Sequence, residues 1–378
     1  MKIKIPYLLT VIISILLIFL GHKIAVNDLF DFQAFSPEVV SAKVQSVIER
    51  VSPDDGLGGF MPMLGDKIIF EAIITNGERK GEVVTAAQNF SGYSRVTAKE
   101  TGKGDSVLLI NMNDEWYFNG YIRTNKLMGL GILFILCLLI FGGKKGFNTV
   151  LSLALTCGAV FAVFIPSILS GKNIYIMSIL VCAYTIIMTL LIVIGFNKKS
   201  LAAATGCLGG LGVSGIITVI MDKVLLLTGI VDEHSRYLAN LPVENPINLR
   251  AIIFAGIIIG AMGAVEDVAT SLASSLWEIK EKAEKIKFET LFRSGLTIGR
   301  DIMGSMANTL ILAYIGSSLS AVLILSVYSG SLFALFNMEM IVVEILQALI
   351  GSLGILFAMP LTAFFCSVFY LKKTIVQT

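Results

Sequence analysis

Hydrophobic positions in this chain gather into long uninterrupted runs. Seven runs follow one another in the later part of the sequence, at about 127–141, 147–169, 174–196, 201–221, 251–275, 302–327 and 340–371, and another covers 5–21. A helix needs about 20 apolar residues to cross a bilayer, and among the seven later runs only 127–141 is marginal. The pattern therefore predicts about eight transmembrane helices.

One long polar stretch, residues 22–126, separates the first run from the others. It contains short β-branched or aromatic runs divided by turn-forming residues, a pattern typical of a small β-barrel of the OB or SH3 type. These runs are 39–50, 66–75, 81–90, 106–113 and 116–123. They carry no basic stripe with interleaved aromatic residues, so nucleic acid binding is not expected. The prediction is a structural cap, with contact to a protein or a lipid as the alternative.

Composition supports a membrane protein. Hydrophobic residues make up 55% of the chain and charged residues only 15%, whereas soluble domains have about 25% charged residues. We predict an all-α polytopic membrane bundle with a small extracytoplasmic β-barrel-like domain. The expected domains are an anchor helix at 1–21, the β domain at 22–126, and a seven-helix domain at 127–378 with an amphipathic linker at 277–300. No small-x-small cleavage site follows the first run, so an anchor is favoured over a signal peptide.

The distribution of basic residues predicts an orientation. Cytoplasmic loops carry an excess of Lys and Arg. If both termini are cytoplasmic, the inner turns hold Lys144, Lys145, Lys198 and Lys199, and the linker and C-terminus add more. The outer loops at 166–173, 232–249 and 328–338 then hold only Lys172 and Arg236. This asymmetry predicts that residues 22–126 lie on the outer side of the membrane.

Candidate chemistry lies first in the run at 251–275. Its small and polar residues recur at three- and four-residue steps, so a helix places them on one face. They are Gly256, Gly260, Gly263, Asp267 and Ser271. The glycines would let another helix approach closely. A carboxylate inside a membrane is costly and is a functional candidate by default, and the adjacent Glu266 would favour proton sharing with Asp267.

A second candidate group precedes and enters the run at 302–327. Asp301, Ser305 and Asn308 share one helical face, with Gly304 beside it. The predicted topology places this group at a depth similar to that of Asp267. Arg300 would pair with Asp267, Glu266 or Asp301, either as a structural salt bridge or as part of an ion or substrate site.

Three further segments have more than one interpretation. The glycine-rich stretch 206–215, with Gly206 and Gly210, indicates close helix packing or an unwound segment beside a cavity. The last run carries Glu344 near its outer end, and Pro360 predicts a kink or break. Residues 277–290 form a charged amphipathic pattern, which suits either the inner membrane surface or a solvated connector.

Cysteine and histidine usage argues against cofactor chemistry. All five cysteines lie in apolar runs, so we expect them to pack and not to form a disulfide framework. His22 and His234 are isolated outside the apolar core, so no metal site is expected. No ATP-binding motif is present, and no cofactor is expected.

Two motifs carry a resemblance to a known family. The stretches GAVEDVATS (263–271) and GRDIMGSMANTLILAY (299–314) resemble the YibE/F-like family of bacterial multi-pass membrane proteins. The similarity covers about residues 125–371 and implies a multi-pass plasma-membrane protein. The sequence departs from the family pattern at Glu266 and Thr270, where methionine is more usual, so the site gains a carboxylate.

The residues favour an ion-coupled transporter or permease. Asp267 would carry the ion or proton, with Arg300 and Asp301 setting its charge state. The first alternative is an assembly or regulatory factor that acts through the external β domain. An intramembrane aspartyl hydrolase using Asp267 and Asp301 is the least favoured, so an enzyme is not expected. The expected partners are membrane lipid and either a second copy or a paralogous membrane protein.

Overall fold

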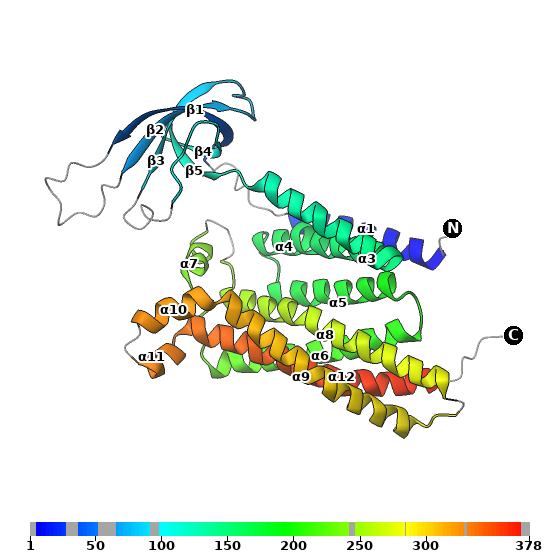
Figure 1. Cartoon of the computed structure of the whole chain (residues 1–378). Helices are drawn as coiled ribbons and strands as arrows, with labels where there is room; N and C mark the ends of the chain where they lie inside the picture. Colours follow the sequence, from blue (N-terminus) through cyan, green and yellow to red (C-terminus); the bar gives the residue numbers. More distant parts are fainter. Residues whose placement is uncertain are drawn as a thin grey trace. The chain divides into compact units, whose positions relative to one another are not determined.

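The computed structural model separates into two compact units. Residues Asp31–Cys137 form one unit, and Met1–Phe30 together with Leu138–Thr378 form the other. The first unit holds all the strands of the barrel and the second holds most of the helices (Figure 1). The structure describes residues 5–27, 37–51, 66–90, 98–241, 246–283, 285–328 and 331–371.

The smaller unit contains a closed five-stranded barrel, as the sequence predicts. The strands are β1 (Val39–Val51), β2 (Lys67–Ile74), β3 (Val83–Asn89), β4 (Ser106–Met112) and β5 (Glu115–Tyr121), in the order β1-β2-β3-β5-β4. Only β3 and β5 pair in parallel; the other neighbours are antiparallel. Side chains of β2 alternate strictly, so that Phe70, Ala72 and Ile74 are buried in the barrel core. These features are those of a small OB-like barrel.

A short polar network fixes the segment before β4. The buried Gln88 Oε1 accepts hydrogen bonds from the backbone N–H of Thr101 at 2.8 Å and from its hydroxyl at 2.5 Å. The Asp105 carboxylate accepts from Lys99 Nζ at 2.9 Å and from the Gly102 N–H at 3.0 Å. These donors favour the ionised form and hold the pKa of Asp105 below its usual value. Gln88 therefore ties the segment to β3, and the contacts of Asp105 fold the segment back on itself.

The larger unit is built from long apolar helices. Six helices of the described chain are long and apolar enough to cross a membrane, and α9 with α10, which meet at a 59° bend, gives a seventh. The long helices are α1 (Ile5–Val26), α3 (Thr124–Gly158), α5 (Ile174–Val193), α6 (Lys198–Val224), α8 (Leu249–Lys282), α9 (Phe288–Ser317) and α12 (Glu339–Leu371). The shorter ones are η3 (Ala159–Phe164), α4 (Ile165–Leu169), α7 (Glu233–Ala239), α10 (Leu319–Tyr328) and α11 (Leu332–Phe336).

The helix α3 is bent sharply at Gly143. Its φ of 53° and ψ of −125° are non-helical and suit a residue without a Cβ. A Cβ on Gly146 would lie 2.0 Å from the carbonyl oxygen of Leu138. In a continuous helix these residues would be about 12 Å apart along the axis. The chain therefore turns back at Gly143, between the two apolar runs seen in the sequence at 127–141 and 147–169.

The helix α12 packs against α6, α8 and α9 (Figure 1). Glycines of α6 lie directly on it: a Cβ on Gly206 would lie 2.0 Å from Thr362 Oγ1, and one on Gly210 would lie 2.6 Å from Ala358 Cβ. This order of contacts shows that α6 and α12 are antiparallel. The whole of α6 is helical, so its glycine-rich stretch is a packing surface and not an unwound segment.

The other helices also alternate in direction. Against α12, α9 is antiparallel, because Gly295 lies near Ala363 and Leu310 lies near Gly351. The helix α8 is parallel to α12, because Ala261 and Ala273 lie near Gly351 and Tyr370, respectively. The first helix runs parallel to the second half of α3: Tyr7 donates to Asn148 Oδ1 at 3.0 Å, and Ile18 contacts Gly158. Such alternation is what successive membrane crossings require.

Two local expectations differ from the structure. The linker expected at 277–300 is divided between the two neighbouring helices, because α8 continues to Lys282 and α9 begins at Phe288. Trp277 packs edge-on against Tyr370 with ring centroids 5.0 Å apart, which anchors the end of α8 on α12. The helix α12 continues through Pro360 without a break.

The contact between α6 and α12 leads to a stability prediction. Gly210→Ala should lower the free energy of unfolding by about 1–3 kcal/mol, because its methyl group would meet Ala358 and the carbonyl of Gly354. The matched control is Gly212→Ala on the same helix, where no neighbouring atom lies within 4 Å. It should gain up to about 1 kcal/mol from helix propensity. Thermal unfolding in detergent measures both, and equal stability of the two variants would contradict this account.

Candidate functional site

The exposed face of α8 is unlike that of a lipid-facing helix. On α1, exposed side chains are large and apolar, for example Leu16 at 52% and Phe19 at 64% exposure. No large hydrophobic side chain of α8 is exposed. Its exposed positions within the predicted membrane run are Gly256, Gly260, Gly263, Asp267 and Ser271. The face predicted from sequence spacing thus exists, but no other helix of the described chain covers its part from Gly263 to Ser271.

Like α8, the helix α9 exposes small and polar residues over most of its length and buries its apolar ones. Its apolar residues, among them Leu291, Ile298 and Met303, pack into the main core with α8 and α12. Residues 293–309 expose no large hydrophobic side chain. The exposed small and polar positions are Arg293, Thr297, Arg300, Asp301, Gly304, Ser305, Asn308 and Thr309. We call the surface formed by these positions and by the exposed positions of α8 the polar lane.

Two contacts fix the register of α8 against α9. A Cβ on Gly260 would lie 2.6 Å from Tyr314 Oη, and one on Gly295 would lie 3.0 Å from Leu276 Cδ1. The helices are therefore antiparallel, and Asp267 is about level with Ser305. The same register places Asp301 level with Ser271, which is one turn, or about 6 Å, from the level of Asp267. The structure thus brings the two sequence-predicted groups to neighbouring depths.

Three charged residues of the lane, Arg300, Asp301 and Asp267, have no partner side chain in the part of the chain that the structure describes, whereas Arg293 pairs with Glu289 at 2.7 Å. Glu266 is partly buried and near enough for its charge to affect Cys207 of α6, whereas the adjacent Asp267 is exposed. The salt bridge expected between Arg300 and one of these carboxylates does not form within the described chain, because their side chains leave the helices at different levels or on different sides.

The lane has distinct ends. At the C-terminal end of α8 it meets an open hollow of about 780 Å³, lined by Ile279, Lys287, Glu289, Thr290, Arg293, Ser294, Thr297 and Ile298. At the other end, the Tyr314 hydroxyl lies against Gly260, and Gln347 Nε2 approaches Gly256. Glu344 of α12 is half-buried and near enough to act on Tyr314. The polar surface therefore runs from an open hollow to an end that is narrowed by the Tyr314 and Gln347 side chains.

The glycines predicted to pack fall into different environments. Gly206 and Gly210 contact α12, whereas Gly256 and Gly260 meet only the tips of Gln347 and Tyr314. Gly263 and Gly304 have no neighbouring atom within 4 Å. Sequence reasoning missed Arg293, Thr297 and Thr309. Their four-residue spacing with Asp301 and Ser305 was the signal that could have revealed the full length of the lane.

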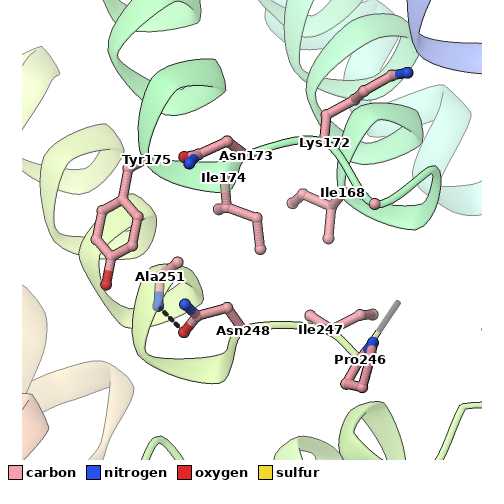
Figure 2. A pocket seen from close by; sticks show the side chains of 10 residues that line it. Ile168, Lys172, Asn173, Ile174, Tyr175, Pro246, Ile247, Asn248 and Ala251 are labelled. Atoms are coloured by element: carbon pink, nitrogen blue, oxygen red, sulfur yellow. Dashed lines mark hydrogen bonds between the residues drawn. The ribbon is translucent and has the colours of Figure 1, made fainter. Parts of the chain in front are cut away.

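A smaller pocket lies between the beginning of α5 and the approach to α8 (Figure 2). Its volume is about 210 Å³. Asn248 accepts a hydrogen bond from the Ala251 N–H at 3.1 Å, and Asn173 caps α5 in the same way. Tyr175 projects away from the centre of this pocket (Figure 2). These amides serve as helix caps, so the polar lane is the stronger candidate.

Long apolar helices with a polar lane define a multi-helix membrane protein, here joined to a small five-stranded barrel. A family model described as YibE/F-like protein matches residues 130–372, and the chain belongs to this family. The match includes both α8 and α9, and therefore the whole lane. Comparison with curated proteins and with solved structures gave no match.

The contact between Tyr314 and Gly260 gives a second prediction. Gly260→Ala should be about 1 kcal/mol less stable than Gly263→Ala, because the new methyl group would displace the Tyr314 hydroxyl and so cancel the gain in helix propensity. Removing that hydroxyl in a Gly260→Ala/Tyr314→Phe double variant should restore most of the loss. Gly263→Ala is the control, since its surroundings are open. If thermal unfolding shows Gly260→Ala to be as stable as Gly263→Ala, the register of α8 and α9 is wrong.

Proposed function

We propose that the protein is an integral protein of the bacterial plasma membrane with eight spans and with both termini in the cytoplasm. The turn at Gly143 supports two spans within residues 124–169. The alternating directions of the packed helices fit successive crossings, and the basic pairs at Lys144 and Lys198 fit cytoplasmic turns. Residues 22–126, which contain the barrel, are then extracytoplasmic.

Within this arrangement, the protein acts as an ion-coupled transporter or permease, and the polar lane is the path of its coupling ion. The observation that carries this proposal is the lane itself, a charged and small-residue surface on two apolar helices. Ionisable groups inside a membrane face a bundle interior or a water-filled cavity, and there they mark ion or proton pathways. The coupling ion that best fits the lane's carboxylates and hydroxyls is a proton or a small cation.

Each part of the lane has a proposed role. The hollow beside Arg293 admits water from the cytoplasm, and Asp267, midway along the lane, is the group that takes up the ion. Arg300, about one turn closer to the hollow, limits the negative charge near Asp267. Tyr314 against Gly260 closes the extracytoplasmic end, and the bend between α9 and α10 at Ser318 is the place where this end would open.

A second candidate function rests on the barrel. It is a compact unit with its own hydrophobic core, so it could act as the docking part of an assembly or regulatory factor. The aspartyl hydrolase alternative has less support. It needs two facing aspartates, whereas the register offsets Asp267 and Asp301 by about one turn.

Cysteine labelling tests the proposed orientation. In a variant without the native cysteines, Asp114→Cys or Asn240→Cys should react with a membrane-impermeant maleimide added to intact cells. Asn197→Cys and Lys282→Cys should react only after the membrane is opened. All four positions are exposed in the structure, so access to the reagent is the variable being measured. External labelling of Lys282→Cys would reverse the orientation.

Asp267→Asn tests ion coupling, because it preserves side-chain size but removes the titrating charge. In proteoliposomes containing a pH-sensitive or a sodium-sensitive dye, the wild-type chain should dissipate an imposed proton gradient or sodium gradient, respectively. Asp267→Asn should lower the rate at least about tenfold, the size of effect expected for one essential ionisable group. Its thermal stability should change by no more than about 0.5 kcal/mol, because Asp267 is exposed and has no partner within the described chain.

The control for this experiment is Glu278→Gln, which removes an exposed carboxylate at the end of the same helix, outside the lane. It should retain the wild-type rate. A folded Asp267→Asn protein with an unchanged rate would remove Asp267 from the mechanism. A wild-type chain without proton or sodium flux would leave the assembly-factor function as the better account.

A further inference from the structure

In the described chain, no other helix covers the part of the polar lane that extends from Gly263 to Ser271 on α8 and from Arg300 to Ser305 on α9. Gly263 and Gly304 meet no atom within 4 Å, and Asp267, Asp301 and Ser305 are exposed. We propose that a second copy of this chain covers this surface, forming a two-fold symmetric dimer in which α8 and α9 of both subunits meet. The inference rests on the proposed membrane placement of α8 and α9 but not on any transport activity.

A protein cover follows from the properties of the bilayer. Charged groups in the hydrocarbon region are costly. The exposed faces of α1 and α12 carry large apolar side chains, as expected for helices in contact with lipid. Small residues are characteristic of interfaces between membrane helices, because they allow backbones to approach closely. Gly263 of α8 and Gly304 of α9 are both exposed and would meet no atom within 4 Å of an added Cβ, so both could accept a neighbouring helix without loss of an existing contact.

Charge complementarity favours a second copy as the occupant. Two identical subunits inserted in the same orientation can be related by a two-fold axis along the membrane normal, which brings equal depths together. Arg300 and Asp301 are consecutive and differ in depth by only about 1.5 Å. The axis can therefore place Arg300 opposite Asp301 of the partner subunit, and the reciprocal pair forms at the same time. Neither residue has an ion-pair partner within the described chain.

The same symmetry would enclose the middle of the lane. Asp267 and Ser305 lie at one level, so the two subunits together would place two carboxylates and two hydroxyls around the seam. The dimer would thereby convert an exposed half-surface into an enclosed polar path. In that arrangement the path is incomplete in a single subunit.

Disulfide cross-linking tests the interface in native membranes. In the full chain without its native cysteines, Ser305→Cys should form a covalent dimer on mild oxidation. Leu349→Cys lies on the exposed apolar face of α12 and is the matched control, so it should remain monomeric. A monomeric Ser305→Cys chain, or equal cross-linking at both positions, would overturn the proposal. The lane would then face water or a different protein.

A charge-swap experiment identifies the pairs. Arg300→Asp and Asp301→Arg should each reduce the dimer at least about tenfold, because each puts like charges opposite one another. When differently tagged chains carrying the two substitutions are co-expressed, opposite charges face again and a mixed dimer should be recovered in a pull-down. Failure of the mixed dimer to form would contradict the Arg300–Asp301 pairing. The flux measurement on Asp267→Asn is separate, so loss of either proposal leaves the other testable.

Discussion

Polar side chains in the hydrocarbon core of a bilayer lose their hydration, and this single constraint organises the larger unit of the protein. Where the chain exposes Leu16 or Phe19, the surface suits lipid; where it exposes Asp267 or Asp301, it does not. The proposals for transport and for dimerisation both follow from that contrast. The first proposal makes the lane a path for an ion, and the second makes it a surface for a second copy. A path enclosed between two subunits is consistent with both proposals.

Glycine has two physical roles in this architecture. Gly206 and Gly210 bring α6 against α12 so closely that a Cβ would overlap with side-chain or backbone atoms. These contacts build the core of the bundle. Gly263 and Gly304, on the other hand, leave space unfilled within the chain. Glycine therefore allows close helix packing inside the bundle and also leaves an uncovered surface on α8 and α9.

The amino-acid pattern predicted the barrel and the apolar helices, because alternation along residues 67–74 and long apolar runs depend on local periodicity. It also predicted that Asp267 lies on a glycine face. It did not predict that Arg300 would be unpaired, because pairing depends on the tertiary register of α8 and α9. The full lane was missed for a related reason: Arg293 and Thr297 lie in a segment interpreted as a surface linker, whereas the structure includes them in α9.

The central claim is that the polar lane does not face lipid. Its most direct test is spin-label accessibility in a reconstituted bilayer, with a label at Ser305 on the lane and a reference label at Leu349 on the apolar face of α12. Both positions are exposed in the chain, so only their surroundings in the membrane distinguish them. The account predicts that collisions with oxygen, which concentrates in the hydrocarbon, are much less frequent at Ser305 than at Leu349. Equal oxygen accessibility at the two labels would place the lane in contact with lipid and would contradict the account.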